Sequence, residues 1–164
     1  NTNGKEDTAF TVQYDFCMPE RFDLSYTNQD GVKQRAFVVH RSSIGAIERL
    51  MAFLIEHYAG AFPVWLAPTQ VLILPISDSH NDYAKKVLAE LKKSGIRTEV
   101  NLDNETLGKK IRAGKTQKIP YLVVIGDKEI ASGKLTAEGR GEKLEGISLA
   151  DFITRLQTEI KEKK

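Results

Sequence analysis

The stretch from Phe37 to Pro68 reads FVVHRSSIGAIERLMAFLIEHYAGAFPVWLAP, and the rest of the chain is organised around it. It opens with an apolar run, residues 37–39, which predicts a buried strand that ends at His40 and Arg41. Apolar side chains then recur every three or four residues, as on one face of a helix, and predict a helix over residues 44–58. These side chains belong to Ile44, Ile47, Met51, Leu54, Ile55 and Tyr58.

Polar residues at the start of this predicted helix allow two interpretations. Backbone N–H groups at a helix start attract anions, and Arg49, in the first turns, could pair with a phosphate. A Glu48-Arg49 pair is more often a solvated helix face, and periodicity alone favours that interpretation by about three to one. His40, taken alone, is more often a structural histidine than a ligand. These residues by themselves do not decide between a site and a surface.

The bulk composition fits a globular domain. The 164 residues correspond to one ordinary domain and a little more, and the hydrophobic fraction of 41% is enough to build a core. The net charge of +2 gives no general polybasic character, so a nucleic-acid partner must be argued from local clusters. The single cysteine, Cys17, allows no internal disulfide and fits a cytoplasmic location.

Two further features concern the ends and the membrane. No apolar run is long enough to cross a bilayer and no signal peptide is recognised, so no membrane association is expected. The chain begins Asn-Thr-Asn-Gly, without Met, which leads us to expect a part excised from a longer protein.

The first forty residues predict an antiparallel meander. Alternating apolar residues indicate strands at 9–16 and 22–26, and the apolar run at 37–40 is the third. Asn28 to Gly31 supplies the turn signal. The helix over residues 44–58 should pack on this meander. Because three strands and one helix bury little surface, part of their apolar surface is expected to be exposed.

The rest of the chain predicts an α/β domain with a mixed sheet. Its pattern is β-α-β-α-β-β-α, which is a layered arrangement with helices on the faces of the sheet. The run VLILPI at residues 71–76 has no alternation and so indicates a central strand that is covered on both faces. The elements that follow are expected near residues 79–94 (helix), 97–102 (strand), 106–115 (helix), 120–125 (strand), 130–136 (strand) and 149–160 (helix).

Basic residues cluster around the second of these helices. They are Lys109, Lys110, Arg112, Lys115 and Lys118. Lys109, Arg112 and Lys115 are spaced by three and can share a helix face that holds phosphates. A solvated helix face explains the same residues equally well.

Longer strings of the sequence resemble one enzyme family. His40-Arg41, Gly45 to Arg49 and Ala59 to Pro68 look like the third motif of the class II catalytic domain in threonyl-tRNA synthetases and its link to the anticodon-binding domain. Asn104 to Arg112 and Ile119 to Glu129 resemble segments of that second domain. The resemblance covers nearly the whole chain. It implies that residues 1–66 are the C-terminal part of the catalytic domain and residues 67–164 a class IIa anticodon-binding domain.

The resemblance implies a tRNA-binding role for the second domain. Asn104, Lys118 and Glu129 match positions that contact the anticodon bases. Unstacked loop bases are read best by amides, carboxylates and stacking groups, which suits Asn104 and Glu129. We expect all three residues near one edge of the sheet, with threonine tRNA as the partner.

The resemblance also implies roles in chemistry for the first domain. Arg49 matches the arginine that packs on adenine and reaches the γ-phosphate of ATP, which is bound with Mg. Gln13 matches a residue that faces the substrate pocket for L-threonine. His40 matches one of three zinc ligands, and the other two, a Cys and a His, are expected outside this chain. The fragment alone is therefore expected to be inactive and to bind no stoichiometric zinc, although the parent would be a homodimeric ligase.

Some positions depart from the family pattern and leave alternatives open. Thr8 and Ala9 stand where a Gln-Cys pair is usual, Ala46 replaces a Ser, and Glu138 replaces an Arg used in anticodon reading. A carboxylate beside RNA should weaken binding. A non-catalytic, synthetase-like paralogue that binds RNA or a partner is one alternative. A generic α/β ligand-binding domain is another, and it predicts a pocket unrelated to residues 104–129.

Overall fold

A computed structural model describes residues 4–6, 8 and 10–164. The chain divides into two compact units, Asn1–His57 and Tyr58–Lys164. We call Asn1–His57 the first unit and Tyr58–Lys164 the sheet module. Each unit is described by itself.

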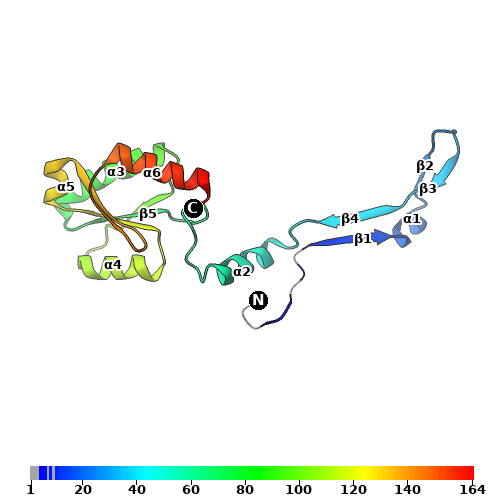
Figure 1. Ribbon diagram of the computed structural model, residues 1–164, viewed down its shortest axis with the longest axis horizontal. Helices are drawn as coiled ribbons and strands as arrows, with labels where there is room; N and C mark the ends of the chain where they lie inside the picture. Colours follow the sequence, from blue (N-terminus) through cyan, green and yellow to red (C-terminus); the bar gives the residue numbers. More distant parts are fainter. Residues whose placement is uncertain (1–3, 7, 9) are drawn as a thin grey trace. The chain divides into compact units, whose positions relative to one another are not determined.

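The first unit is built on two antiparallel strand pairs (Figure 1). β1 (Thr11–Asp15) pairs with β4 (Val38–Ser42), and β2 (Ser25–Thr27) pairs with β3 (Lys33–Arg35). The antiparallel pairing was expected, but the order is not that of a meander, because β1 pairs with the last strand and the β2–β3 hairpin is inserted between them. Ala9, where the first strand was expected to begin, lies outside the described residues.

A short helix changes the course of the chain after β1. α1 (Cys17–Arg21) begins where the Asp15 carboxylate accepts hydrogen bonds from the backbone N–H groups of Cys17 and Met18, both at 3.0 Å. Pro19 lies in the first turn of this helix, where a missing N–H costs nothing. The chain therefore turns away from β1 before it forms the next strand pair.

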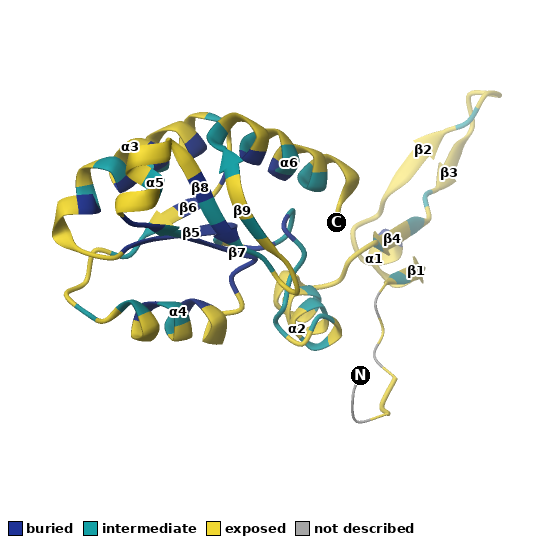
Figure 2. Ribbon diagram, turned by 60° about the vertical axis from the view of Figure 1, so that its left-hand side comes forward, coloured by how far each residue is buried: buried dark blue, intermediate teal, exposed yellow. Residues whose placement is uncertain are grey.

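Most apolar side chains of the first unit face solvent, as expected from so small a set of elements. Phe10, Tyr14, Phe16 and Phe37 are each more than 60% exposed. Figure 2 shows β2 and β3 in the colour of exposed residues. α2 (Ile47–His57) contains no buried residue, so it forms no core with the strands, contrary to the packing expected from its apolar stripe. Among the described residues of this unit, nothing buries that stripe.

The sheet module contains one mixed five-stranded sheet in the order β6-β5-β7-β8-β9. β6 and β7 run parallel to the central β5, and β8 and β9 continue antiparallel. The strands are β5 (Val71–Pro75), β6 (Thr98–Val100), β7 (Tyr121–Ile125), β8 (Lys134–Glu138) and β9 (Lys143–Ser148). The helices are η1 (Asp78–His80), α3 (Asn81–Lys93), α4 (Leu107–Thr116), α5 (Asp127–Ser132) and α6 (Leu149–Glu162). The predicted layered α/β architecture with a mixed sheet is confirmed.

Helices cover the two faces of the sheet. α3 and α6 lie on one face and α4 on the other (Figure 1). The larger core, on the side of α3 and α6, includes Ile73, Val123 and Phe152, and the smaller one, on the side of α4, includes Leu72 and Leu122. β5 is buried along its whole length (Figure 2), which is the reason for its unbroken apolar run.

A glycine lets α4 lie close to the sheet. A Cβ atom at Gly114 would come within 2.6 Å of a Leu122 methyl and 3.2 Å of a Leu72 methyl. The close approach brings the whole of α4 against β5 and β7.

Two elements of the module were not anticipated. Residues 130–136 form the end of α5 and the start of β8, because the Glu129 carboxylate accepts the Gly126 N–H at 3.0 Å and caps a short helix. β9 was missed because its alternation is interrupted: a bulge between Leu135 and Thr136 of the β8–β9 ladder coincides with Gly146 at φ +68°.

The boundary between the units lies ahead of the expected one at residues 66 and 67. The segment after His57 packs with the sheet module: Val64 is buried in the larger core, and its N–H donates to the Lys164 carbonyl at 3.1 Å. Gln70, also buried, donates from its side-chain amide to the Val64 carbonyl at 2.8 Å. In the described part of the chain, no helix is long and apolar enough to span a bilayer.

Candidate nucleic-acid interface

The structure brings Asn104 and Glu129 to the same edge of the sheet. Asn104 lies in the loop between β6 and α4, and Glu129 lies in α5, directly after β7. Because β6 and β7 both run parallel to β5, their carboxyl ends meet at one edge. This edge of an open α/β sheet is where such folds usually bind ligands.

The two side chains differ in how firmly they are held. One Glu129 carboxylate oxygen accepts the Gly126 N–H at 3.0 Å, and the other accepts the Thr136 hydroxyl at 2.8 Å. Asn104 is exposed, and its amide has no hydrogen-bond partner among the described residues. The edge therefore presents a fixed carboxylate and an open amide.

A buried histidine supports the position of α5 at this edge. His80 is 5% exposed, and its Nδ1 accepts the Ser77 N–H at 3.2 Å, so its Nε2 carries the proton and donates to the Asp127 carboxylate at 3.1 Å. The ring thus links the segment after β5 to the start of α5. Sequence reasoning missed His80, because its partner Asp127 lies on a different element.

Lys118 lies at the opposite end of the strands, so the expectation that all three residues share one edge is wrong. It follows α4 and precedes β7, whereas Asn104 precedes α4. A helix of 10 residues is about 15 Å long, which separates the two positions. Lys118 has φ +56°, and its ammonium donates to the Ala59 carbonyl. Its assignment to the anticodon bases stays a prediction.

The variant Lys118→Met separates a structural role from a base contact. Loss of the hydrogen bond to Ala59 should cost about 1 kcal/mol and lower the melting temperature by about 5 °C, measured by circular dichroism. If the chain reads the anticodon, as its resemblance implies, the folded variant should discriminate between anticodon loops as well as the unchanged chain. Loss of that discrimination with an unchanged melting temperature would instead show that Lys118 contacts a base.

On the face of the sheet covered by α4, β8 runs from the carboxyl edge of the parallel strands toward the end at which Lys118 lies. Leu135 and Ala137 point into the larger core, so Thr136 and Glu138 point to the α4 side. Glu138 forms an ion pair with Lys115 of α4 at 2.6 Å. A hollow of about 400 Å³ adjoins this pair, and its lining includes Lys118, Leu122 and Arg140.

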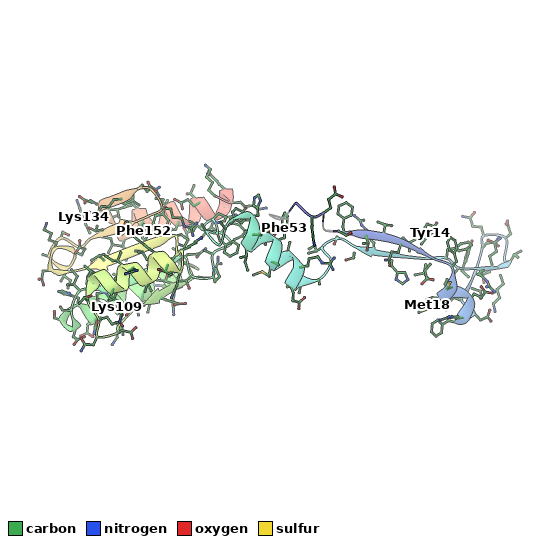
Figure 3. All side chains as sticks on the ribbon, turned by 90° about the horizontal axis from the view of Figure 1, so that it is seen from below. Tyr14, Met18, Phe53, Lys109, Lys134 and Phe152 are labelled. Carbon is green, nitrogen blue, oxygen red and sulfur yellow. The ribbon has the colours of Figure 1, made fainter. Side chains whose placement is uncertain are left out.

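The basic residues of α4 do not form one free cationic face. Lys109 pairs with Glu105 at 2.5 Å (Figure 3 labels Lys109), and this contact raises the pKa of the Lys109 ammonium. Lys115 pairs with Glu138, and Lys110 is 4% exposed. Arg112 is exposed and has no ion pair among the described residues. The expected shared face of Lys109, Arg112 and Lys115 is solvent-exposed, but two of its cations already have carboxylate partners.

The burial of Lys110 had a signal in the sequence. Leu107, Ile111 and Gly114 form the face of α4 that packs on the sheet, and position 110 falls on the same stripe by three- and four-residue spacing. Because Lys110 is charged and has basic neighbours, the sequence alone groups it with the basic cluster rather than with the apolar stripe.

In the first unit, β1 and β4 bring Gln13 and His40 together. The two residues are opposite each other in the strand pair, so their side chains share a face. His40 Nε2 lies 2.8 Å from the Asp15 carboxylate. The pKa of Asp15 is lowered, first by the Met18 N–H and then by His40. An open hollow of about 500 Å³ is lined by Gln13, Tyr14, Asp15, Phe16, Cys17 and His40.

Arg49 is not among the residues that line this hollow. Its guanidinium donates to the Thr8 carbonyl at 3.1 Å, and the side chain lies in the exposed part of α2. The described residues also contain no group of three or more His, Cys, Asp or Glu that could hold a metal. By themselves they do not fit a zinc site.

Comparison with known proteins agrees with this architecture. Residues 70–159 match the family model described as the anticodon binding domain. The chain is 49% identical over 165 residues to the threonine--tRNA ligase of Clostridium botulinum (strain Eklund 17B / Type B), covering 100% of this chain and 26% of the relative. It is 52% identical over 151 residues to that of Clostridium tetani, covering 92% and 24%. The chain thus spans about a quarter of the length of these curated relatives.

A solved structure is similar over nearly the whole chain. The RNA binding domain of threonyl-tRNA synthetase from Cryptosporidium parvum Iowa II aligns with a TM-score of 0.80 and 31% sequence identity, covering 97% of this chain and 41% of that one. The family match takes in all five strands of the sheet module. The chain therefore belongs to the anticodon binding domain family, as its resemblance to threonyl-tRNA synthetases predicted.

Proposed function

We propose that this chain recognises the anticodon loop of threonine tRNA as part of a threonine--tRNA ligase. The observation that carries the proposal is the family match over residues 70–159, which coincides with the mixed-sheet module. At the carboxyl edge of its parallel strands, this module presents the Asn104 amide after β6 and the fixed Glu129 carboxylate after β7, with β5 between the two strands. The similarity of the whole chain to threonine--tRNA ligases supports threonine as the amino acid of the pair.

The groups at this edge suit unstacked bases. An amide offers donors and acceptors together, and a carboxylate offers lone pairs beyond those used by Gly126 and Thr136. Such groups can read the Watson–Crick edge of a splayed loop base. Arg112 would contact phosphate directly, whereas Lys109 and Lys115 would have to exchange Glu105 and Glu138 for phosphate. Recognition would therefore combine base reading at the edge with salt-dependent phosphate binding along α4.

The complete ligase would join L-threonine to the tRNA with ATP and Mg. In that setting we assign Arg49 to ATP and Gln13 to the amino-acid pocket, and His40 would be one zinc ligand among others outside this chain. Gln13 lines the open hollow of the first unit, which suits a small substrate. We further propose that the complete ligase is a homodimer and works in the cytoplasm. The first unit would then supply part of a catalytic domain.

The chain alone should neither bind zinc at one-to-one stoichiometry nor activate threonine. His40 offers a single ligand, whereas a catalytic zinc ion needs three ligands from the protein. Metal analysis after dialysis and threonine-dependent ATP–pyrophosphate exchange are the measurements. Tight equimolar zinc would contradict the assignment of the remaining ligands to residues outside this chain.

The tRNA proposal is tested by titrating two RNA hairpins at two salt concentrations. One hairpin carries the threonine anticodon loop, and the other has the anticodon bases replaced on the same stem. We expect tighter binding of the first at both salt concentrations, because base contacts are less sensitive to salt than phosphate contacts. Equal affinity for both hairpins would reject anticodon reading by this chain. It would favour a general RNA- or partner-binding role.

A further inference from the structure

One lysine of α4 is buried although its neighbours are exposed. Lys110 is 4% exposed, and its ammonium lies 3.2 Å from the Pro75 carbonyl and 3.3 Å from the Asn101 carbonyl. Pro75 ends β5, and Asn101 directly follows β6. A single side chain thus ties α4 to the carboxyl ends of two adjacent parallel strands.

Burial of this charge is not needed for packing alone. Position 110 lies on the stripe of α4 that packs on the sheet, where an apolar side chain would fill the space without desolvating an ammonium. A buried ammonium is retained at low cost only where it is well hydrogen-bonded, and here both bonds go to backbone carbonyls. The charge therefore serves to hold the backbone of the two segments.

The segment held in this way carries Asn104. Ahead of α4, the backbone groups of residues 101–105 make two hydrogen bonds to the rest of the module in the described chain, and the Glu105 side chain adds an ion pair with Lys109. The Asn101 N–H donates to the Ile73 carbonyl at 3.0 Å, and Lys110 donates to the Asn101 carbonyl. The Asp103 and Glu105 N–H groups bond only within the segment, at 2.9 Å each. Loss of the Lys110 ammonium would leave the backbone of the loop held only through the Asn101 N–H, with the exposed Glu105–Lys109 ion pair as a side-chain contact.

We propose that Lys110 is a positioning residue for base recognition, and that it acts by fixing the 101–105 loop so that the Asn104 amide is presented at the sheet edge. This inference rests on the proposed anticodon-reading function. Lys110 itself touches no RNA. Lys110 fixes the position of the Asn104 amide, and so it contributes to discrimination between anticodon loops rather than to affinity for phosphate.

The variant Lys110→Met tests this role, because it keeps the unbranched apolar stem and removes the ammonium. With the threonine hairpin and the base-replaced hairpin as probes, the ratio of their affinities should fall about tenfold, the usual size of a lost hydrogen bond to a charged group. The slope of log affinity against log salt should stay unchanged. Amide hydrogen exchange of residues 101–105 without RNA should become faster, while that of β5 and β7 stays slow.

Lys115→Met is the matched control, since it makes the same substitution at an exposed position of the same helix, and Lys115 pairs with Glu138 rather than with a residue of the 101–105 loop. It should retain discrimination and reduce the salt slope by about 0.7, the value for one phosphate of a single strand. Should Lys110→Met fail to fold, Lys110→Gln takes its place, because it removes the charge while its amide NH2 group keeps two N–H donors. Lys110→Arg, with the charge retained, should restore most of the discrimination.

The outcomes separate this inference from the function on which it rests. If the unchanged chain does not distinguish the two hairpins, the anticodon-reading proposal fails. If the unchanged chain does distinguish them and the folded Lys110 variant does so equally, with unchanged exchange in residues 101–105, the positioning role is overturned. Reduced discrimination with faster loop exchange supports it.

Discussion

Phe152→Ala will lower the free energy of unfolding of the sheet module by about 3–5 kcal/mol, because it empties a fully buried position of the larger core. Phe152 is fully buried on α6, and its ring meets that of Tyr121 edge-on, with centroids 5.5 Å apart. Removal of the ring leaves a cavity between α6 and the sheet. The melting temperature should fall by about 15–30 °C.

The surroundings of Tyr121 make collapse of this cavity difficult. The Tyr121 hydroxyl donates to the Glu159 carboxylate at 2.9 Å, and burial raises the pKa of that hydroxyl, an effect that Glu159 strengthens. Arg155 pairs with Glu159 at 3.0 Å and also with Glu142. This network fixes α6 against the sheet, so the helix cannot simply move inward to fill the space.

Phe53→Ala is the control for Phe152→Ala. Phe53 is also a helical phenylalanine, but it is 58% exposed on α2 (labelled with Phe152 in Figure 3). Its replacement should change the free energy of unfolding by less than about 0.5 kcal/mol. Urea unfolding followed by circular dichroism measures both. Equal losses in the two variants would show that the core of the module does not lie under α6.

Asn104→Asp should reduce the affinity for the threonine hairpin by about 5–150-fold, and so remove most of the discrimination against the base-replaced hairpin. The variant keeps the size of the side chain and replaces the amide donor by an acceptor. An unsatisfied partner at a base edge costs about 1–3 kcal/mol, which sets this range. Because the Asn104 amide has no partner among the described residues, the fold itself should be unaffected.

Asn28→Asp controls for the added negative charge. Asn28 holds the β2–β3 turn through its carbonyl oxygen, which accepts the N–H groups of Asp30 and Val32, and an aspartate keeps this acceptor. Its charge lies in the first unit and should leave discrimination unchanged. Fluorescence anisotropy with both hairpins at constant salt is the measurement. If the two variants lose affinity equally, simple repulsion of RNA explains the result and Asn104 reads no base.

Local patterning was sufficient for most of the sheet module. The unbroken apolar run of β5 indicated a strand covered on both faces, and the stripe of α6 around Phe152 indicated a core-facing helix. These inferences succeed because burial leaves a local pattern in the sequence: an unbroken apolar run where both faces are covered, and a helical period where one face is covered. The resemblance to threonyl-tRNA synthetases came from longer strings, and the family match together with the similar ligases and the similar solved structure bears it out.

The amino-acid sequence by itself thus indicates most of the strands and helices and the family, because each of these is recognised from residues close together in sequence. The pairing of β1 with β4, the burial of Lys110 beside exposed Lys109, and the placing of Lys118 at the opposite end of the strands from Asn104 emerge only in the folded chain. The physical reason is that strand direction and crossover connections determine which strand ends lie together. In addition, the Pro75 carbonyl at the end of β5 accepts a hydrogen bond from the Lys110 ammonium, which comes from an element distant in sequence.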